Sequence, residues 1–265
     1  MYSRAKFLAN IALGAILPTI AGFGESAVPS GAALSAGIAE ANAGAYDKMQ
    51  SFVCSERIDR FAGKTGAGTA HHLDTIRAKV SFENGQEHYS EVTRDKRSLP
   101  GISSVAGAWS EGEFGTLLHQ TEESLRSKPI QFEREGEING TAAAEFHFDV
   151  AEQDSPWDLI VAGRHYRVPF RAEVWVAKFS REIIKVSRKY IGDGDDSLAS
   201  TNIAELKWSL TLAPIEMKGK RWLLPKDGEY SVEYKENGHR EWNELTFFDY
   251  HRYGAEATVR FSSEE

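Results

Sequence analysis

The chain contains a single cysteine, Cys54, so no disulfide can form within it. An exported form must therefore be held together by its own core. Cys54 is also misplaced for a lipid anchor, because it follows Phe52-Val53 rather than an apolar run and a small residue. A catalytic cysteine would need a histidine and an activating environment. We interpret Cys54 as a buried structural thiol near the start of a strand.

Positive charge is also in short supply. Thirty-one lysines and arginines face 39 aspartates and glutamates, which gives a formal net charge of −8. A general nucleic-acid-binding surface must be basic to neutralise phosphates, so this balance argues against a nucleic-acid partner. The mean hydropathy of −0.42 excludes a protein with several membrane spans.

The common catalytic and repeat signatures are missing. The sequence has no G-x-S-x-G elbow, no phosphate-binding loop and no dinucleotide fingerprint. It shows no internal repeat with a period of roughly 20–50 residues, which disfavours a propeller or a solenoid.

Metal-ligating residues are scattered. His71 and His72 are adjacent and would point to opposite faces of a strand, so they make a poor pair of ligands. His147 and Asp149 would share one face, which we interpret as a polar outer surface. The acidic stretch 192–196 lacks the ligand order of a calcium loop. We expect neither a metal nor a cofactor.

The first residues have the layout of a secretory signal. Arg4 and Lys6 precede an uncharged run, Phe7–Gly24, and small residues follow it. A single membrane anchor is the alternative, but Pro18 interrupts the run, which is slightly short for a span. We expect residues 1–28 to be a signal peptide, which predicts a periplasmic or extracellular location and no transmembrane span after cleavage.

The remainder, 29–265, is predicted to form one β-rich domain. Helical spacing predicts a helix at about 35–50 and a second at about 110–126. Alternating strands dominate elsewhere, and Asn-Gly pairs suited to tight hairpin turns occur at 84–85, 139–140 and 237–238. Successive hairpins predict an α+β fold in which a large, curved antiparallel sheet packs on the two helices.

The stretch WSEGEFGTLL at 109–118 allows two interpretations. Two glutamates beside a tryptophan resemble the acid and base of a hydrolase. Ser110 and Glu113 also fit a capping box that starts a helix. Behind them an apolar stripe follows at helical spacing, so we favour the helix start. Gly112 and Gly115 are costly inside a helix and indicate that another element approaches closely.

Several motifs together resemble a family of uncharacterised secreted bacterial proteins of the acidobacterial type. They are SFVCSERIDRF, QEHYSEV, WSEGEFGTLL, VWVAKFSREIIKVSRKY, RWLLPKDGEYSVEY and LTFFDYHRYGAEATVRF, and they span about 45–261. The order of elements is also similar to the periplasmic lipoprotein-carrier (LolA-like) fold. That resemblance implies a half-open antiparallel barrel in which helices form a lid over an apolar cavity.

Three functional hypotheses follow. The first is a non-enzymatic carrier that binds lipid or a lipidated partner in an apolar cavity. The second is a protein–protein interaction module of the cell envelope with a filled core, and the third is a hydrolase with unassigned carboxylates. The expected cavity-lining residues are apolar side chains of the second helix and tryptophans from separate strands: Phe114, Leu117, Leu118, Trp175, Trp208 and Trp222.

Overall fold

The structure is a computed structural model that describes residues 31–44, 52–64, 70–83, 86–192, 194–236 and 238–252. The expected signal peptide, the second part of the first helix and the turn at 84–85 lie outside these residues. In the described ranges no helix is both long and apolar enough to cross a membrane.

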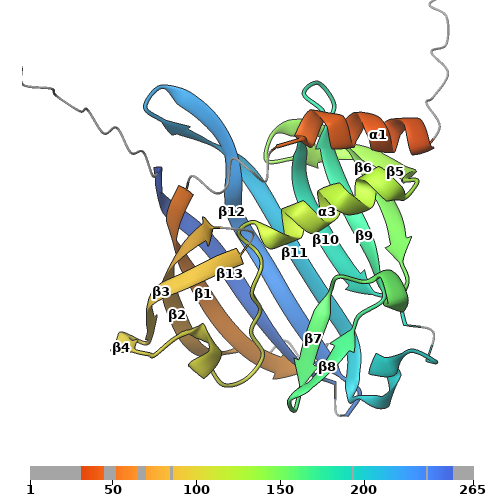
Figure 1. Ribbon diagram of the computed structural model, residues 1–265. Helices are drawn as coiled ribbons and strands as arrows, with labels where there is room; N and C mark the ends of the chain where they lie inside the picture. The colour runs from red at the N-terminus through yellow and green to blue at the C-terminus, as the bar shows by residue number, and fades with distance from the viewer. Residues whose placement is uncertain are drawn as a thin grey trace, which may run out of the picture.

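One antiparallel sheet of eleven strands forms the body of the molecule, in the order β4-β3-β2-β1-β13-β12-β11-β10-β9-β6-β5 (Figure 1). Its strands are β1 (Phe52–Lys64), β2 (Ala70–Glu83), β3 (Gln86–Arg94), β4 (Arg97–Ser98), β5 (Gln131–Ile138), β6 (Thr141–Val150), β9 (Phe170–Ala177), β10 (Ile183–Tyr190), β11 (Ile203–Met217), β12 (Lys220–Tyr234) and β13 (His239–Arg252). A separate hairpin pairs β7 (Asp158–Val161) with β8 (Arg164–Arg167). Short 3₁₀ turns lie at Ile102–Ser104, Glu152–Asp154 and Ser197–Ser200.

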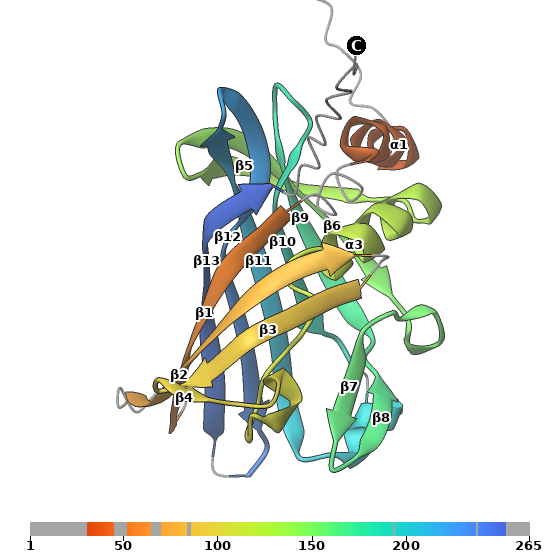
Figure 2. The ribbon, with the colours of Figure 1, turned by 60° about the vertical axis from the view of Figure 1, so that its left-hand side comes forward.

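The sheet curls without closing, because β4 and β5 form its two ends and do not pair with each other. Helices α1 (Gly31–Asn42) and α3 (Thr116–Ser127) both lie against the face toward which the sheet curls (Figure 2). The predicted fold class, a curved antiparallel sheet packed on two helices, is confirmed. Consecutive hairpins build most of the sheet, and the pairing of β1 with β13 joins the first strands to the last.

Strand β1 shows how the alternation in the sequence sets the register. Every second residue from the start of β1 is buried, and the residues between them are half-exposed; the buried ones are Phe52, Cys54, Glu56, Ile58 and Arg60. Side chains alternate across a strand, so this face points to the core. The predicted burial of Cys54 is confirmed, and burial raises the pKa of its thiol, which makes it a poor nucleophile.

The second helix starts later than the sequence predicts. Helix α3 begins at Thr116 after Gly115, and no side chain of its own segment caps it, so the expected capping box at Ser110 and Glu113 is wrong. Gly112 has a φ of 105°, a left-handed conformation that ends any helix attempted from Ser110. The predicted apolar stripe is confirmed: Phe114, Leu117, Leu118, Thr121 and Leu125 are all buried.

Gly115 permits the close approach that its position suggested. A Cβ atom placed there would lie 3.0 Å from Cδ2 of Phe82, a side chain that is fully buried. Because Phe82 has no solvent to move into, the start of α3 and β2 fit together only with glycine at this position.

We therefore expect Gly115→Ala to destabilise the protein by about 1–3 kcal/mol through overpacking. Urea unfolding followed by circular dichroism measures the change. Gly101→Ala is the matched control, because the new Cβ atom would lie 3.9 Å from its nearest neighbour, Oγ of Ser103. Its free energy of unfolding should stay within about 0.5 kcal/mol of the wild-type value. Equal effects of the two substitutions would contradict this account.

Candidate functional site

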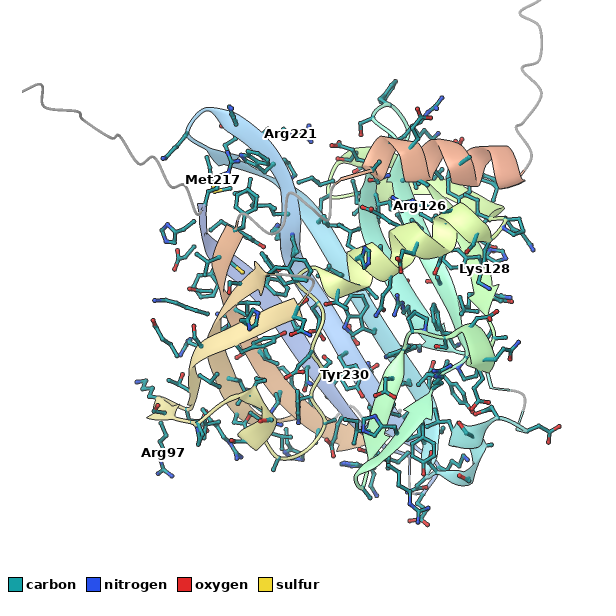
Figure 3. The ribbon with its side chains drawn as sticks, viewed as in Figure 1. Arg97, Arg126, Lys128, Met217, Arg221 and Tyr230 are labelled. Atoms are coloured by element: carbon teal, nitrogen blue, oxygen red, sulfur yellow. The ribbon has the colours of Figure 1, made fainter. Side chains whose placement is uncertain are left out.

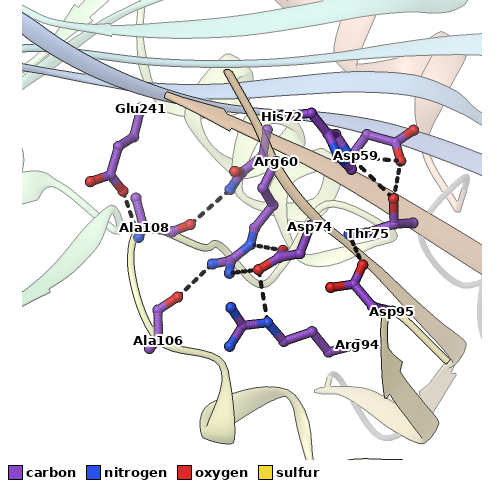
Figure 4. Close-up of polar contacts among 11 residues, drawn as sticks. Asp59, Arg60, His72, Asp74, Thr75, Arg94, Asp95, Ala106, Ala108 and Glu241 are labelled. Atoms are coloured by element: carbon purple, nitrogen blue, oxygen red, sulfur yellow. Dashed lines mark hydrogen bonds and ion pairs between the residues drawn. The ribbon is translucent and has the colours of Figure 1, made fainter. Parts of the chain in front are cut away.

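The segment that leads into α3 is fastened to the sheet by a buried ion pair (Figure 4). Arg60 of β1 donates two hydrogen bonds of 2.6 Å to the carboxylate of Asp74 on β2, and its Nη1 donates to the carbonyl of Ala106 at 2.6 Å. Burial alone would raise the pKa of Asp74, but Arg60 and Arg94 outweigh it and hold this pKa below its usual value.

A second attachment follows two residues later in the same segment. The carboxylate of Glu241 accepts a hydrogen bond from the backbone N–H of Ala108 at 3.0 Å. Asn243, also on β13, donates to the carbonyl of Ala108 at 3.1 Å. Ala106 and Ala108 are thus held by β1 and β13, which fixes the direction from which the chain enters α3.

The N-terminus of α3 is capped from another strand. The Glu87 carboxylate, on β3, accepts from the backbone N–H groups of Gly112, Gly115 and Thr116 at 3.2, 2.8 and 3.3 Å. It also accepts from the hydroxyl of Tyr89 at 2.7 Å. A carboxylate at this end of a helix satisfies free N–H groups and complements the helix dipole.

Below α1 and α3 lies a pocket of about 170 Å³. Its apolar wall comes from α3, β10, β11 and β12: Leu118, Ile183, Leu212, Trp222 and Leu224. An engineered apolar cavity of about 150 Å³ holds a benzene molecule, so a pocket of this size has room for a group of about that size and not for a whole acyl chain.

Asn42 closes the pocket on the side of α1. Its amide donates to the carbonyls of Ile38 and Arg181 at 2.7 and 3.0 Å, and its side-chain oxygen accepts from the N–H of Ile183 at 2.9 Å. These bonds use both N–H donors of the buried amide and one of the two lone pairs of its oxygen. The last turn of α1 is therefore tied to the start of β10.

The mouth of the pocket is aromatic and basic. Arg221, an exposed residue of β12, lines the pocket beside Trp222, and Figure 3 places it at the β11–β12 hairpin. The Trp222 ring meets Phe52 edge to face at 5.2 Å, and the guanidinium of Arg252 lies 4.9 Å from the ring centre of Trp222. Glu182 is the acidic residue in the lining.

Searches for similar proteins show a distant likeness of fold. No protein-family model matches the chain, and no curated protein matches it. An outer membrane lipoprotein-sorting protein domain from Vibrio parahaemolyticus aligns with a TM-score of 0.41 and 14% identity, covering 86% of this chain and 95% of that one. A DUF1329 family protein from Desulfovibrio piger aligns with a TM-score of 0.39 and 11% identity, covering 88% of this chain and 93% of that one.

The lipoprotein LppX of Mycobacterium tuberculosis aligns with a TM-score of 0.29 and 9% identity, covering 82% of this chain and 94% of that one. The lipoprotein-sorting resemblance read from the sequence thus reappears among solved structures. At TM-scores of 0.41 and below the likeness is distant, so the function proposed below is argued from the residues of this chain.

The structure divides the six residues expected to line a cavity. Leu118 and Trp222 line the pocket. Phe114, Leu117 and Trp208 are buried in the main core but do not line it. Trp175 belongs to a second cluster with Ala143, Ala177 and Ile184 on the other face of the sheet, so its assignment to the cavity is wrong. Its neighbours Val174 and Val176 take the inward positions.

The two glutamates of WSEGEF lie in different surroundings. Glu111 is exposed, whereas Glu113 is 1% exposed and accepts a hydrogen bond from the indole N–H of Trp208 at 2.9 Å. Burial, then the charge of Glu87, raises the pKa of Glu113 to about 7. Sequence reasoning missed that Glu113 meets Glu56 and Glu87, because strands far apart in the sequence bring them together.

The scattered polar candidates pair with surface neighbours. Nδ1 of His147 lies 3.0 Å from the carboxylate of Glu133, and Asp149 accepts from Nε of Arg171 at 2.7 Å. Asp196 caps a short 3₁₀ turn through two backbone N–H groups. Among the described residues no group of three His, Cys, Asp or Glu is placed to hold a metal ion.

Asp74→Asn should destabilise the protein by about 3 kcal/mol at pH 7, because it leaves Arg60 buried without its counter-charge. The native pKa of Asp74 is depressed, so its contribution is present above its usual pKa of 3.8 and is lost as the pH falls through the lower native value. The difference between variant and wild type in urea unfolding should therefore narrow at acidic pH.

The matched control is Asp149→Asn. Asp149 has a similar bidentate arginine partner, but both side chains are nearly half-exposed. Asp149→Asn should therefore lower the free energy of unfolding by less than about 1 kcal/mol. An Asp74→Asn effect as small as that of the control would refute the anchoring role of the Arg60–Asp74 pair.

Proposed function

We propose that this chain is an exported, non-enzymatic protein that binds a lipid or a lipidated partner between its sheet and its two helices. The observation that carries the proposal is the pocket under α1 and α3, whose walls combine Leu118 of the helix with Ile183, Leu212 and Trp222 of the sheet. Hydrophobic walls with a small number of polar groups are the usual form of a site for a lipid-like ligand with a polar end.

Binding is passive in this proposal. The closed pocket accepts one end of an acyl chain, and a longer ligand needs α1 and α3 to move off the sheet. A few side-chain hydrogen bonds tie the helices to the sheet: those of Asn42 hold α1, and those of Glu87 and Arg188 hold α3. The ligand then replaces contacts that helix and sheet otherwise make with each other.

A second function, an interaction module of the cell envelope, is favoured by one observation. Most of the concave face is filled by the chain's own side chains in one continuous core. Phe114, for example, contacts Phe247 and Tyr250 at ring distances of 6.3 and 6.2 Å. A core that never opens would leave only the outer surface for partners.

Lipid mass spectrometry separates these two functions. The chain with its leader is expressed in a Gram-negative host, purified from the periplasm and extracted with organic solvent. We expect acyl lipid in near-stoichiometric amount. Leu212→Trp fills the pocket and should remove most of it, whereas Ile160→Trp, at a 60% exposed position on β7, should not. A folded wild type that is empty would refute the carrier function.

Arg221 is expected to contact an anionic headgroup, because its exposed guanidinium lies at the rim of the pocket. Charge-assisted hydrogen bonds contribute about 1.5 kcal/mol or more, less where water competes. Arg221→Gln should therefore weaken binding of oleate about three- to tenfold and leave binding of oleyl alcohol unchanged, as measured by displacement of a fluorescent probe. Lys226→Gln, an exposed change outside the pocket, is the control. Equal weakening of acid and alcohol would contradict the headgroup contact.

A further inference from the structure

Three glutamates meet where α3 begins. Glu56 comes from β1, Glu87 from β3, and Glu113 from the turn just before α3. Glu56 and Glu113 are each 1% exposed, so water does not reach them. Glu87 holds the first N–H groups of α3 through the hydrogen bonds described above. The three acids therefore lie between the sheet and the helix end that covers the pocket.

Two of these carboxyl groups have an oxygen without a partner. Within the described residues, Oε2 of Glu56 and Oε2 of Glu113 accept no hydrogen bond, although both atoms are buried. No lysine, arginine or histidine of the described ranges forms an ion pair with Glu56, Glu87 or Glu113. A buried carboxylate that has no counter-ion and one oxygen without a hydrogen bond is unfavourable, so both positions favour the protonated acid.

The other titratable groups around the cluster supply no positive charge. They are Cys54 on β1, Tyr89 on β3, Glu111 beside the turn, Tyr230 on β12 and Tyr250 on β13. The thiol and the phenols have pKa values raised by burial, so they remain neutral. Glu111 adds a further acid. A second negative charge in the cluster is therefore repelled by the first, and none of these neighbouring groups carries a positive charge that could neutralise it.

We propose that Glu56, Glu87 and Glu113 form a proton-sensitive latch that holds the N-terminal end of α3 on the sheet. The helix stays closed while Glu56 and Glu113 are protonated, and loss of these protons repels the turn that carries Glu113 away from the neighbouring acids. Leu118, in the first turn of α3, lines the pocket, so release of this turn opens it. This consequence for ligand binding rests on the proposed function, whereas the latch itself does not.

The direction of the pH effect follows from burial. Burial, then the charge of Glu87, raises the pKa of Glu113 from 4.5 to about 7, and burial raises that of Glu56 well above its usual value. At a pH between 4.5 and about 7, Glu113 keeps its proton in the closed chain and loses it in an open chain. Opening therefore becomes more favourable as the pH rises from 4.5 to about 7, and Glu56 adds to the increase from its usual pKa of 4.5 upward.

Cys54 is a native probe of this opening. It is 2% exposed and interacts with Tyr250, whose ring packs against Phe114 immediately before α3. The experiment measures the rate at which methyl methanethiosulfonate modifies Cys54 in the full chain between pH 5 and pH 8. Each rate is divided by the rate for the chain unfolded in urea at the same pH, which removes the titration of the thiol itself.

We expect the normalised wild-type rate to rise by at least about 30-fold between pH 5 and pH 7, because ionisation of Glu113 contributes about that much and Glu56 adds to it. Glu113→Gln keeps an acceptor for Trp208 but cannot ionise, so the rise in its rate over this range should be smaller than that of the wild type by a factor of about 30. Glu123→Gln, at a 61% exposed position of the same helix, should follow the wild type. A flat wild-type profile, or identical profiles for wild type and Glu113→Gln, would overturn the latch.

Two further measurements guard the result. Should Glu113→Gln fail to fold by circular dichroism, Glu56→Gln replaces it, and its rate must rise less than that of the wild type between pH 5 and pH 8. Low urea must leave the wild-type rate at pH 7 unchanged, because local opening exposes little surface. A steep urea dependence would assign the labelling to global unfolding and overturn the proposal. No lipid is present, so a working latch in a chain that binds no lipid would refute the proposed function alone.

Discussion

The buried pair of Arg60 and Asp74 is the constraint on which the placement of α3 depends. Both side chains lie on the concave face of the sheet, where an unpaired charge would be very costly. Their pairing leaves one guanidinium nitrogen to hold the carbonyl of Ala106. The segment before α3 therefore starts from a fixed point, and the helix must lie across the sheet rather than beside it.

Beyond that fixed point the attachment of the helix changes character. Its N-terminus is not capped by its own segment but by Glu87 from β3, in a cluster with two further acids. At Ala106 the segment is held by the Arg60–Asp74 pair, in which the two charges neutralise each other. At Gly115 it is held by Glu87, whose acidic neighbours have no positive partner. The second attachment therefore depends on the charge of the glutamates, and the first does not.

Much of the architecture could be predicted from local pattern. Alternation identified the buried face of β1, and Asn139 and Gly140 form the expected tight turn with positive φ values of 49° and 79°. The apolar stripe of α3 was visible at helical spacing. These features depend on near neighbours in the sequence, whose periodicity survives in the folded chain.

The site was harder to predict, because it depends on contacts between distant segments. Ser110 and Glu113 satisfy the local rules of a capping box, yet Glu113 is drawn into the core by Trp208, 95 positions away. Trp175 alternates as expected, but the sequence does not state which face of β9 is inward. Glu87 has no local mark as a helix cap, since its role exists only once β3 lies beside α3.

The open edges of the sheet have a mechanical consequence. A closed barrel has a circumference fixed by its hydrogen bonds, so its interior cannot widen unless strands separate. Here β4 and β5 are not joined, and β5 is exposed along almost its whole length and carries charged residues that discourage pairing with another chain. The sheet can therefore become less curved, and the space on its concave face wider, while every strand stays paired with its neighbours.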